Sequence, residues 1–209
     1  MRSTVSETTR APIRVLVVDD EPEVRDAYRQ IFCDPVEDAQ SAARRTLGAK
    51  LFGGEEVRRP DRQPTTTMTF DPEFCDGAEA AVAAVKAALD AKQPFAVVFL
   101  DMRMPPGPDG IWAAARIRDL DPAIEIAVCT AYSDVDPYDI GGRVPPEDKL
   151  SYLQKPFHPH EVRQMTIALA SKWRAEQNIT RLAYFYSLTG LPNREQAHTR
   201  LRSALEVAL

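Results

Sequence analysis

The stretch IRVLVVDDEP, residues 13–22, decides the fold. Its first six residues form an apolar run rich in β-branched side chains, which is typical of a strand buried in a parallel sheet. Asp19 or Asp20 can cap a helix, and Pro22 suits a first helical turn. Apolar residues then recur at helical spacing, at Val24, Ala27, Tyr28 and Ile31. A strand that leads directly into a helix predicts the first half of a βαβ unit.

The same alternation of strand and helix continues along the chain. Strand patterns cover residues 13–18, 68–74, 95–100, 124–129 and 150–153, and helix patterns begin near residues 22, 78, 111 and 159. Residues 134–144 fit either a helix or a loop. Strands that alternate with helices predict an α/β fold with a doubly wound, five-stranded parallel sheet.

The composition excludes several classes of protein. The 209 residues are 44% hydrophobic and 27% charged, which argues against global disorder. A net charge of −5 and a pI of about 5.3 leave no sequence-wide basic field for nucleic acid. The longest apolar runs have six residues, far short of the roughly 20 that span a bilayer, and the polar N-terminus is no secretory signal. Three cysteines without metal-type spacing predict no disulfide framework, so we expect a cytoplasmic protein.

The chain begins with a tail and a main domain that holds an insertion. Residues 1–12 are polar, and we expect them to be flexible, whereas residues 13–170 carry the strand and helix pattern. Residues 34–66 interrupt this pattern with Gly53-Gly54 and several prolines, so we interpret them as an insertion after the first helix. Six basic and three acidic side chains give residues 44–62 a charge of +3, which suits a solvated loop or a surface for a partner or phosphate.

Polar residues stand at the carboxyl ends of four of the five predicted strands. In an open α/β sheet, ligands bind beyond this edge. Three carboxylates there would repel one another and raise each other's pKa unless a cation joined them, and oxygen ligands favour Mg²⁺. An aspartate beside Mg²⁺ can attack a phosphoryl group, while an ammonium group and a hydroxyl contact the phosphoryl oxygens. The residues concerned are Asp19, Asp20, Asp101, Thr130 and Lys155.

These residues lie in motifs that resemble the receiver domain of two-component response regulators. The resemblance covers residues 13–170 and implies a flavodoxin-like sheet with strand order 2-1-3-4-5. It also implies that a sensor histidine kinase or a phosphotransfer protein is the phosphodonor partner. The matching stretches are Val17–Glu21, Leu100–Pro105, Cys129–Ala131 and Tyr152–Phe157.

The resemblance implies a role for each residue of the set. Asp101 would be the phosphoacceptor, and Thr130 and Lys155 would form the switch pair that responds to the phosphate. Tyr152, three residues before the lysine, matches the aromatic side chain that swings inward when the threonine moves. The implied Mg²⁺ site consists of Asp20, Asp101 and the backbone carbonyl of Arg103, with Asp19 orienting water molecules.

Two departures from the family pattern lie near the site. The run Met104–Gly110 is one residue longer than the usual spacing from the aspartate to the glycine. Arg103 and Tyr132 occupy the two positions that shape the access of water to the acyl phosphate in the family. Because both side chains are bulky, we expect slow dephosphorylation, and loss of the phosphate within seconds would contradict this expectation.

A long helix follows the last predicted strand. It begins near Pro159 and continues to about residue 186, and we interpret residues 171–187 as a linker helix. Its apolar stripe shifts phase across residues 174–178, which marks either a stutter in a coiled coil or the step from packed helix to linker. The stripe therefore packs within the chain or pairs with a second copy in a parallel homodimer.

Residues 188–209 resemble the start of a GGDEF domain, the fold of diguanylate cyclases. The resemblance rests on Leu188–Arg194, with the letters LTGLPNR, and on the helical pattern that follows. We expect this segment to be a fragment, because no GG[DE]EF signature with its metal and nucleotide residues is present. The resemblance implies a parent that makes cyclic di-GMP or carries a degenerate GGDEF domain leading into a phosphodiesterase.

Two other classes of protein use similar residues. A phosphatase that turns over an aspartyl phosphate needs an acid/base group, typically a second Asp two residues on, where this chain has Arg103. An adaptor that works without phosphorylation would use residues 34–66 or the long helix, but it has no need for clustered carboxylates. We therefore expect a signalling switch that is not itself an enzyme, in which phosphorylation of Asp101 signals through the C-terminal helix to a cyclic di-GMP output domain.

Overall fold

In the computed structural model of the protein, residues 11–33, 68–131, 137–184 and 193 are described. They contain one sheet of five parallel strands in the order β2-β1-β3-β4-β5. The strands are β1 (Ile13–Val18), β2 (Phe70–Cys75), β3 (Val97–Asp101), β4 (Glu125–Thr130) and β5 (Leu150–Gln154). The helices are α1 (Pro22–Cys33), α3 (Ala78–Asp90), α4 (Gly110–Leu120), α5 (Pro137–Arg143) and α6 (Pro159–Tyr184), with a short 3-10 helix, η1 (Glu147–Lys149), before β5. The predicted doubly wound sheet and its strand order are confirmed.

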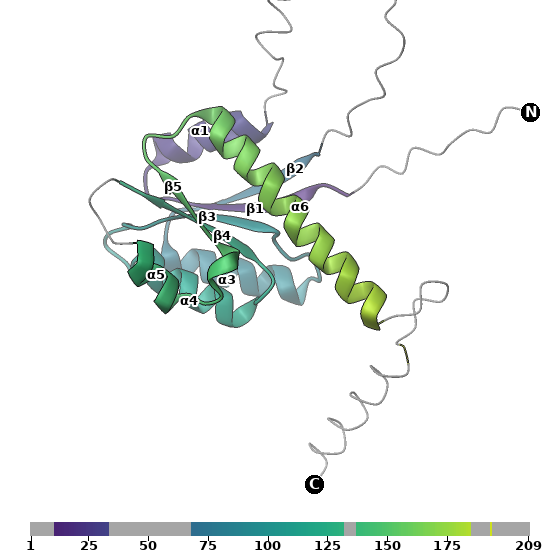
Figure 1. Cartoon of the computed structure of the whole chain (residues 1–209). Coiled ribbons are helices and arrows are strands. Elements are labelled where there is room, and N and C mark those ends of the chain that lie inside the picture. Colours follow the sequence, from purple (N-terminus) through teal and green to yellow (C-terminus); the bar gives the residue numbers. More distant parts are fainter. Residues whose placement is uncertain (1–10, 34–67, 132–136, 185–192, 194–209) are drawn as a thin grey trace, which may run out of the picture.

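The helices cover both faces of the sheet (Figure 1). Helices α1 and α6 lie on one face, and α3, α4 and α5 lie on the other. Successive side chains of a strand point to opposite faces, so each inner strand contributes to two cores. In β1, Val15 and Val17 pack in the core with Tyr28 of α1, whereas Leu16 and Val18 pack in the core of the other face. Burial on both faces explains why the inner strands are apolar runs instead of alternating patterns.

Local hydrogen bonds fix where α4 and α6 begin. The Asp109 carboxylate accepts a hydrogen bond from the Trp112 backbone N–H at 2.8 Å, which caps α4. At the start of α6, the His158 backbone N–H donates to Glu161 at 3.0 Å, and His158 Nδ1 accepts from the His160 N–H at 3.2 Å. This reciprocal arrangement satisfies donors that a helix start leaves open.

The boundaries of the elements agree closely with the sequence patterns. Strand β3 begins at Val97, two residues after the start of the apolar run, although Phe95 and Ala96 are also buried. The segment that fitted a helix or a loop contains α5. The 34–66 insertion, the tail up to residue 10, Tyr132 and the GGDEF-like segment apart from Asn193 lie outside the described residues.

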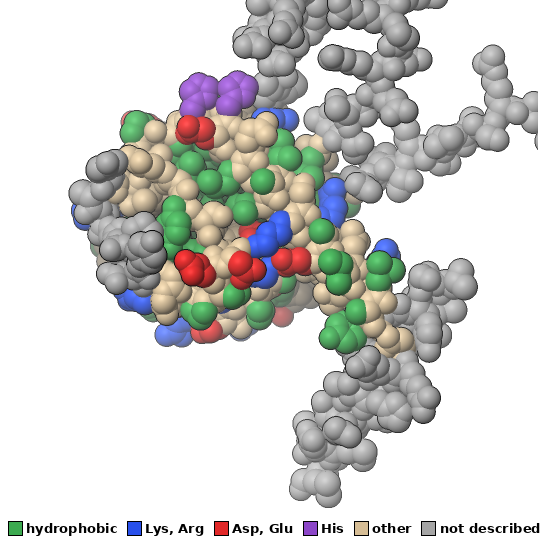
Figure 2. Space-filling view, viewed as in Figure 1, with side chains coloured by type: hydrophobic (Ala, Val, Ile, Leu, Met, Phe, Trp, Pro, Cys, Tyr) green, Lys and Arg blue, Asp and Glu red, His purple; other side chains and the backbone are tan. Residues whose placement is uncertain are grey.

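Helix α6 extends past the edge of the sheet at its C-terminal end (Figures 1 and 2). Ile179 and Leu182 there are 66% and 64% exposed, so the second half of the apolar stripe is not buried in the domain. At the helix end, the Asn193 backbone N–H donates to the Tyr184 carbonyl at 2.8 Å, and the Asn193 amide donates to the Ala183 carbonyl. Among the described residues, no helix combines the length and apolar character needed to cross a bilayer.

Candidate functional site

The three predicted carboxylates meet at the carboxyl edge of the sheet. Asp19 and Asp20 follow β1, and Asp101 is the last residue of the neighbouring strand β3. One carboxylate oxygen of each lies within 4.8 Å of the others, a spacing that could hold a metal ion. The parallel pairing of β1 with β3 brings these side chains together from positions about eighty residues apart in the sequence.

Lys155, directly after β5, bridges two of the carboxylates. Its Nζ lies 2.7 Å from Asp19 Oδ2 and 2.7 Å from Asp101 Oδ1. Asp19 is 1% exposed and Asp101 is 8% exposed, so both ion pairs lie in a partly desolvated environment where charges interact strongly. In the described part of the chain, three carboxylates lie together with the Lys155 ammonium group, and the Arg25 guanidinium contacts the backbone of Asp19, so negative charge still exceeds positive charge there.

Backbone donors hold the remaining oxygens of the two buried carboxylates. The Arg103 N–H donates to Asp101 Oδ2 at 3.1 Å, and the Glu21 N–H donates to Asp19 Oδ1 at 3.0 Å. The Arg25 guanidinium donates to the backbone carbonyl of Asp19 and so ties α1 to the loop that carries the carboxylates. Both carboxylates are therefore oriented before any ligand binds.

Burial and neighbouring charges shift the pKa values of two groups in the cluster, Asp101 and Lys155. Burial raises the pKa of Asp101, and the negative charge of Asp19 adds to this, although the hydrogen bond and charge of Lys155 oppose it. Burial lowers the pKa of Lys155, but the hydrogen bonds and charges of Asp101 and Asp19 outweigh it and raise that pKa overall. A hard cation would relieve the excess negative charge, and an all-oxygen donor set of carboxylates suits Mg²⁺.

We expect Asp101→Asn to stabilise the protein in the absence of Mg²⁺. The raised pKa means that folding disfavours the ionised carboxyl, so a neutral side chain of the same shape should increase the free energy of unfolding by on the order of 1 kcal/mol at pH 7. The gain should disappear as the pH falls below the unfolded-state pKa of about 3.9, where Asp101 is protonated in both states. Urea unfolding in EDTA at several pH values measures the effect, and a less stable variant at pH 7 would contradict it.

Thr130 and Tyr152 lie on the neighbouring strands β4 and β5, and Thr130 lies at the sheet edge that carries the carboxylates. Thr130 ends β4, and its hydroxyl donates to the Ala131 carbonyl at 2.8 Å. The Lys155 backbone N–H donates to the Thr130 carbonyl at 2.9 Å, which joins the two predicted switch residues. Tyr152 lies half-buried in β5 and packs against the core on the face of the sheet that α3, α4 and α5 cover. A contact between the Thr130 hydroxyl and a group on Asp101 therefore requires rotation of the Thr130 side chain.

Gly110 contributes to the site in a way that the sequence pattern did not indicate. Its backbone N–H donates to the Met102 carbonyl at 3.0 Å, and a Cβ on it would lie 2.2 Å from the backbone oxygen of Asp101. No side chain fits at that distance, so the glycine allows α4 to begin against the backbone of the central aspartate. The Asp109-Gly110 pair at a helix start was the available signal.

Tyr28 is a second neighbour that the sequence pattern identified only as an apolar helix position. It is 1% exposed, and its hydroxyl lies 3.2 Å from Cys129 Sγ, in the residue before Thr130. Its ring lies 5.1 Å from that of Phe157, two residues after Lys155, measured between centroids. Tyr28 thus packs behind two strand ends that carry site residues.

A groove of about 440 Å³ adjoins the cluster. Val24 and Ala27 of α1 line one side, and Pro156 and Phe157 line the other, with Lys155 at the end toward the carboxylates. The groove is mostly apolar and lies directly beside Lys155.

Neither a protein-family model nor a curated protein matches the sequence. Solved structures do match the fold. A response regulator receiver domain from Methanospirillum hungatei JF-1 superposes with a TM-score of 0.53 at 15% identity, covering 79% of this chain and 99% of that one. An adenylate cyclase from Rhodopirellula baltica gives 0.54 at 18% identity, with 83% and 98% covered. A response regulator receiver protein from Sinorhizobium medicae WSM419 gives 0.51 at 15% identity, with 78% and 97% covered.

These likenesses concern the fold. The described part of the chain has the fold of CheY-like response regulator receiver domains, as the sequence motifs predicted. The resemblance of residues 188–209 to a GGDEF domain continues to rest on the sequence alone.

Proposed function

We propose that the chain is a response regulator receiver in which Asp101 accepts a phosphoryl group in a Mg²⁺-dependent reaction. The observation that supports this most is the cluster of three carboxylates at one sheet edge with the Lys155 ammonium group bridging two of them. Clustered carboxylates cost stability in a fold that has no use for them. The receiver fold agrees with this chemistry by analogy, and the proposal rests on the residues of the cluster.

In the proposed site, Asp20, Asp101 and the Arg103 backbone carbonyl hold Mg²⁺, and Asp19 orients its water molecules. When bound, Mg²⁺ neutralises charge on the carboxylates and on the incoming phosphoryl oxygens. The donors are all oxygen atoms, and Asp20 is the least buried of the three carboxylates, which leaves one side of the cluster open to solvent.

The proposed reaction transfers a phosphoryl group to a carboxylate. An oxygen of Asp101 attacks phosphorus and forms the acyl phosphate bond, while the bond from phosphorus to the donor breaks and the donor leaves with the electron pair. Lys155 already contacts Asp101 at 2.7 Å and stabilises negative charge on the phosphoryl oxygens. The Thr130 hydroxyl then gives up its hydrogen bond to the Ala131 carbonyl and donates to a phosphoryl oxygen instead. The side chain of Tyr152, on the neighbouring strand, swings inward when Thr130 moves. Such a response shifts the balance between two existing conformers.

The partner in this proposal is a sensor histidine kinase or a phosphotransfer protein in the cytoplasm. A protein phosphodonor must approach within bonding distance of Asp101, and the apolar groove between α1 and Phe157 gives it a surface beside Lys155. We further propose that α6 carries the signal to a cyclic di-GMP output domain and pairs with a second copy through the exposed side chains of Ile179 and Leu182.

Intact mass spectrometry after incubation with acetyl phosphate and Mg²⁺ tests the proposal. We expect one phosphate adduct on the wild-type chain that needs Mg²⁺ and is absent from Asp101→Asn. Asp90→Asn, which removes an exposed carboxylate at the end of α3, is the matched control and should keep the adduct. Absence of an adduct on the wild type, with Mg²⁺ binding shown independently, would contradict the proposal and favour the phosphorylation-independent adaptor.

A further inference from the structure

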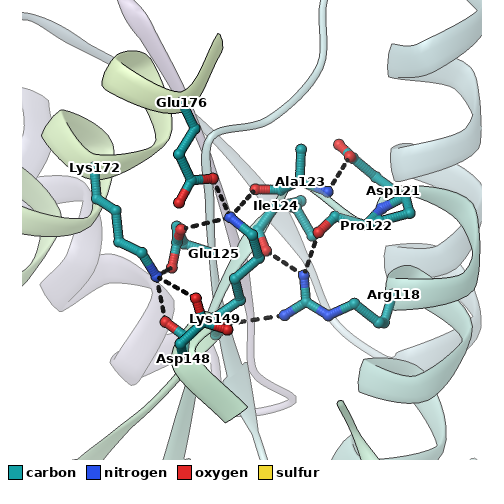
Figure 3. Close-up of polar contacts among 10 residues, drawn as sticks. All are labelled: Arg118, Asp121, Pro122, Ala123, Ile124, Glu125, Asp148, Lys149, Lys172 and Glu176. Atoms are coloured by element: carbon teal, nitrogen blue, oxygen red, sulfur yellow. Dashed lines mark hydrogen bonds and ion pairs between the residues drawn. The ribbon is translucent and has the colours of Figure 1, made fainter. Parts of the chain in front are cut away.

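A fully buried carboxylate lies at the end of the sheet opposite the phosphorylation site. Glu125 is the first residue of β4 and is 0% exposed. Lys149 Nζ lies 3.1 Å from its Oε1, and Lys172 Nζ lies 3.2 Å from its Oε2 (Figure 3). Each carboxylate oxygen thus has its own ammonium group, as a buried charge requires.

Helix α6 contributes two charges of opposite sign to this cluster. Lys172 pairs with Glu125 and also contacts Asp148, while Glu176, one helical turn later, pairs with Lys149 (Figure 3). A rotation of α6 by one residue is about 100°, and a slip by one turn is about 5.4 Å, and either movement would separate these partners. The contacts therefore specify one rotation and one height of α6.

The same cluster lies at the amino ends of two strands whose carboxyl ends carry site residues. Strand β4 begins with Glu125 and ends with Thr130. Lys149 stands just before β5, and Lys155 follows that strand. A strand of five or six residues is about 17–20 Å long, so each connection is short and rigid.

Among the described residues of α6, Glu176 is also the last one that is not exposed. Beyond it, Ile179, Leu182 and Tyr184 are exposed, and Figure 2 shows hydrophobic side chains gathered on this projecting part. The direction in which the projecting helix points is set by its final contacts with the domain.

We propose that Glu125, Lys149, Lys172 and Glu176, here called the Glu125 latch, fix the projecting part of α6 to strands β4 and β5. The latch makes the position of that helix depend on the two strands that carry the switch residues Thr130 and Lys155. This inference deepens the proposed function and rests on it for the link to phosphorylation, whereas the anchoring of α6 itself does not depend on phosphorylation.

Spin labels report the anchoring directly. In the full chain with Cys33 and the half-buried Cys75 replaced by Ser, cysteines introduced as Lys86→Cys on α3 and Leu182→Cys on α6 carry the labels. An excess of unlabelled chain suppresses signals between copies. We expect the distance distribution to broaden at least twofold when Lys172→Met is added. Arg181→Met, which removes an exposed charge from α6 outside the latch, should leave the width unchanged.

A second variant keeps the test decisive if Lys172→Met does not fold. The triple variant Glu125→Leu, Lys149→Met, Lys172→Met replaces the buried carboxylate and its two partly buried ammonium groups by apolar side chains of similar size, a kind of exchange that often preserves folding. It should show the same broadening. An unchanged width in the triple variant would overturn the latch.

Measurements with and without phosphorylation distinguish a failure of the latch from a failure of the proposed function. With acetyl phosphate and Mg²⁺, the wild type should gain the adduct and shift its distance distribution, while the triple variant should gain the adduct without the shift. An equal shift in both would overturn the coupling through the latch. A wild-type chain that gains no adduct would contradict the proposed function, and the width measured without phosphate would still decide whether the latch anchors α6.

Discussion

Replacing Gly110 with Ala is expected to lower the free energy of unfolding by about 3 kcal/mol, the upper end of the usual cost of overpacking. The added methyl group would lie 2.2 Å from the Asp101 backbone oxygen and 3.0 Å from the Met102 Cα, so the backbone must move. In a domain of this size the midpoint of thermal unfolding should fall by roughly 10 °C. Because the group displaced is the backbone of Asp101, the rate of phosphorylation by acetyl phosphate should fall with it.

Gly142→Ala is the matched control for this prediction. Gly142 lies in α5, and a Cβ there would meet nothing within 4 Å. The exchange should leave stability unchanged or raise it by up to about 1 kcal/mol, since Ala is the better helix former. Thermal and urea unfolding compare the two variants. A Gly110→Ala protein as stable as Gly142→Ala would show that the close approach of α4 to Asp101 does not exist.

Lys155→Met is expected to have the second large effect. It leaves Asp19 and Asp101 without the ammonium group that lies 2.7 Å from each, and breaking a buried ion pair from one side is costly. Because Lys155 is itself partly exposed, we expect a loss of about 2 kcal/mol in EDTA at pH 7. The deficit should shrink as the pH falls, because protonation of Asp101, whose pKa is raised by burial, removes its repulsion with Asp19.

Magnesium distinguishes this effect from a simple loss of packing. A divalent cation bound to the same carboxylates should restore much of the lost stability, whereas it would not repair a packing defect. The rate of adduct formation should still fall about a hundredfold, because the cation that stabilises the phosphoryl oxygens is missing. Lys86→Met, on the exposed face of α3, should change neither quantity. Destabilisation that Mg²⁺ does not relieve would contradict the proposed metal site.

The sheet was predictable because its inner strands are buried on both faces. Runs such as Ile13–Val18 and Phe95–Leu100 are short, apolar and rich in β-branched or aromatic residues, and each is followed by a helical pattern. The edge strand β2 shows the alternation of burial expected for a strand with one exposed face. The exact start of a strand was less predictable, because burial begins at Phe95 whereas pairing with the neighbouring strand begins at Val97.

The site was predictable to the extent that parallel strands end at one edge. That rule placed Asp19, Asp20, Asp101 and Lys155 together, and the structure confirms their proximity. It could not indicate that the Thr130 hydroxyl bonds to the Ala131 carbonyl, because side-chain rotamers depend on neighbours that strand order does not specify.

The Glu125 latch was not predictable from the strand pattern. Glu125 stands within an otherwise apolar strand run, and its partners Lys149 and Lys172 lie 24 and 47 residues further along the chain. In the sequence alone, each lysine is typical of a residue on the protein surface. Only the packing of α6 against the amino ends of β4 and β5 brings them to the same carboxylate.

The position of the phosphate tests the central claim most directly. Acyl phosphates are reduced by borohydride, which converts the modified aspartate to homoserine, and peptide mapping then locates it. After incubation with acetyl phosphate and Mg²⁺, we expect homoserine at position 101, and no homoserine when EDTA replaces Mg²⁺. Homoserine at a different aspartate, or a phosphate stable to borohydride on a hydroxyl side chain, would contradict the assignment of Asp101 as the phosphoacceptor.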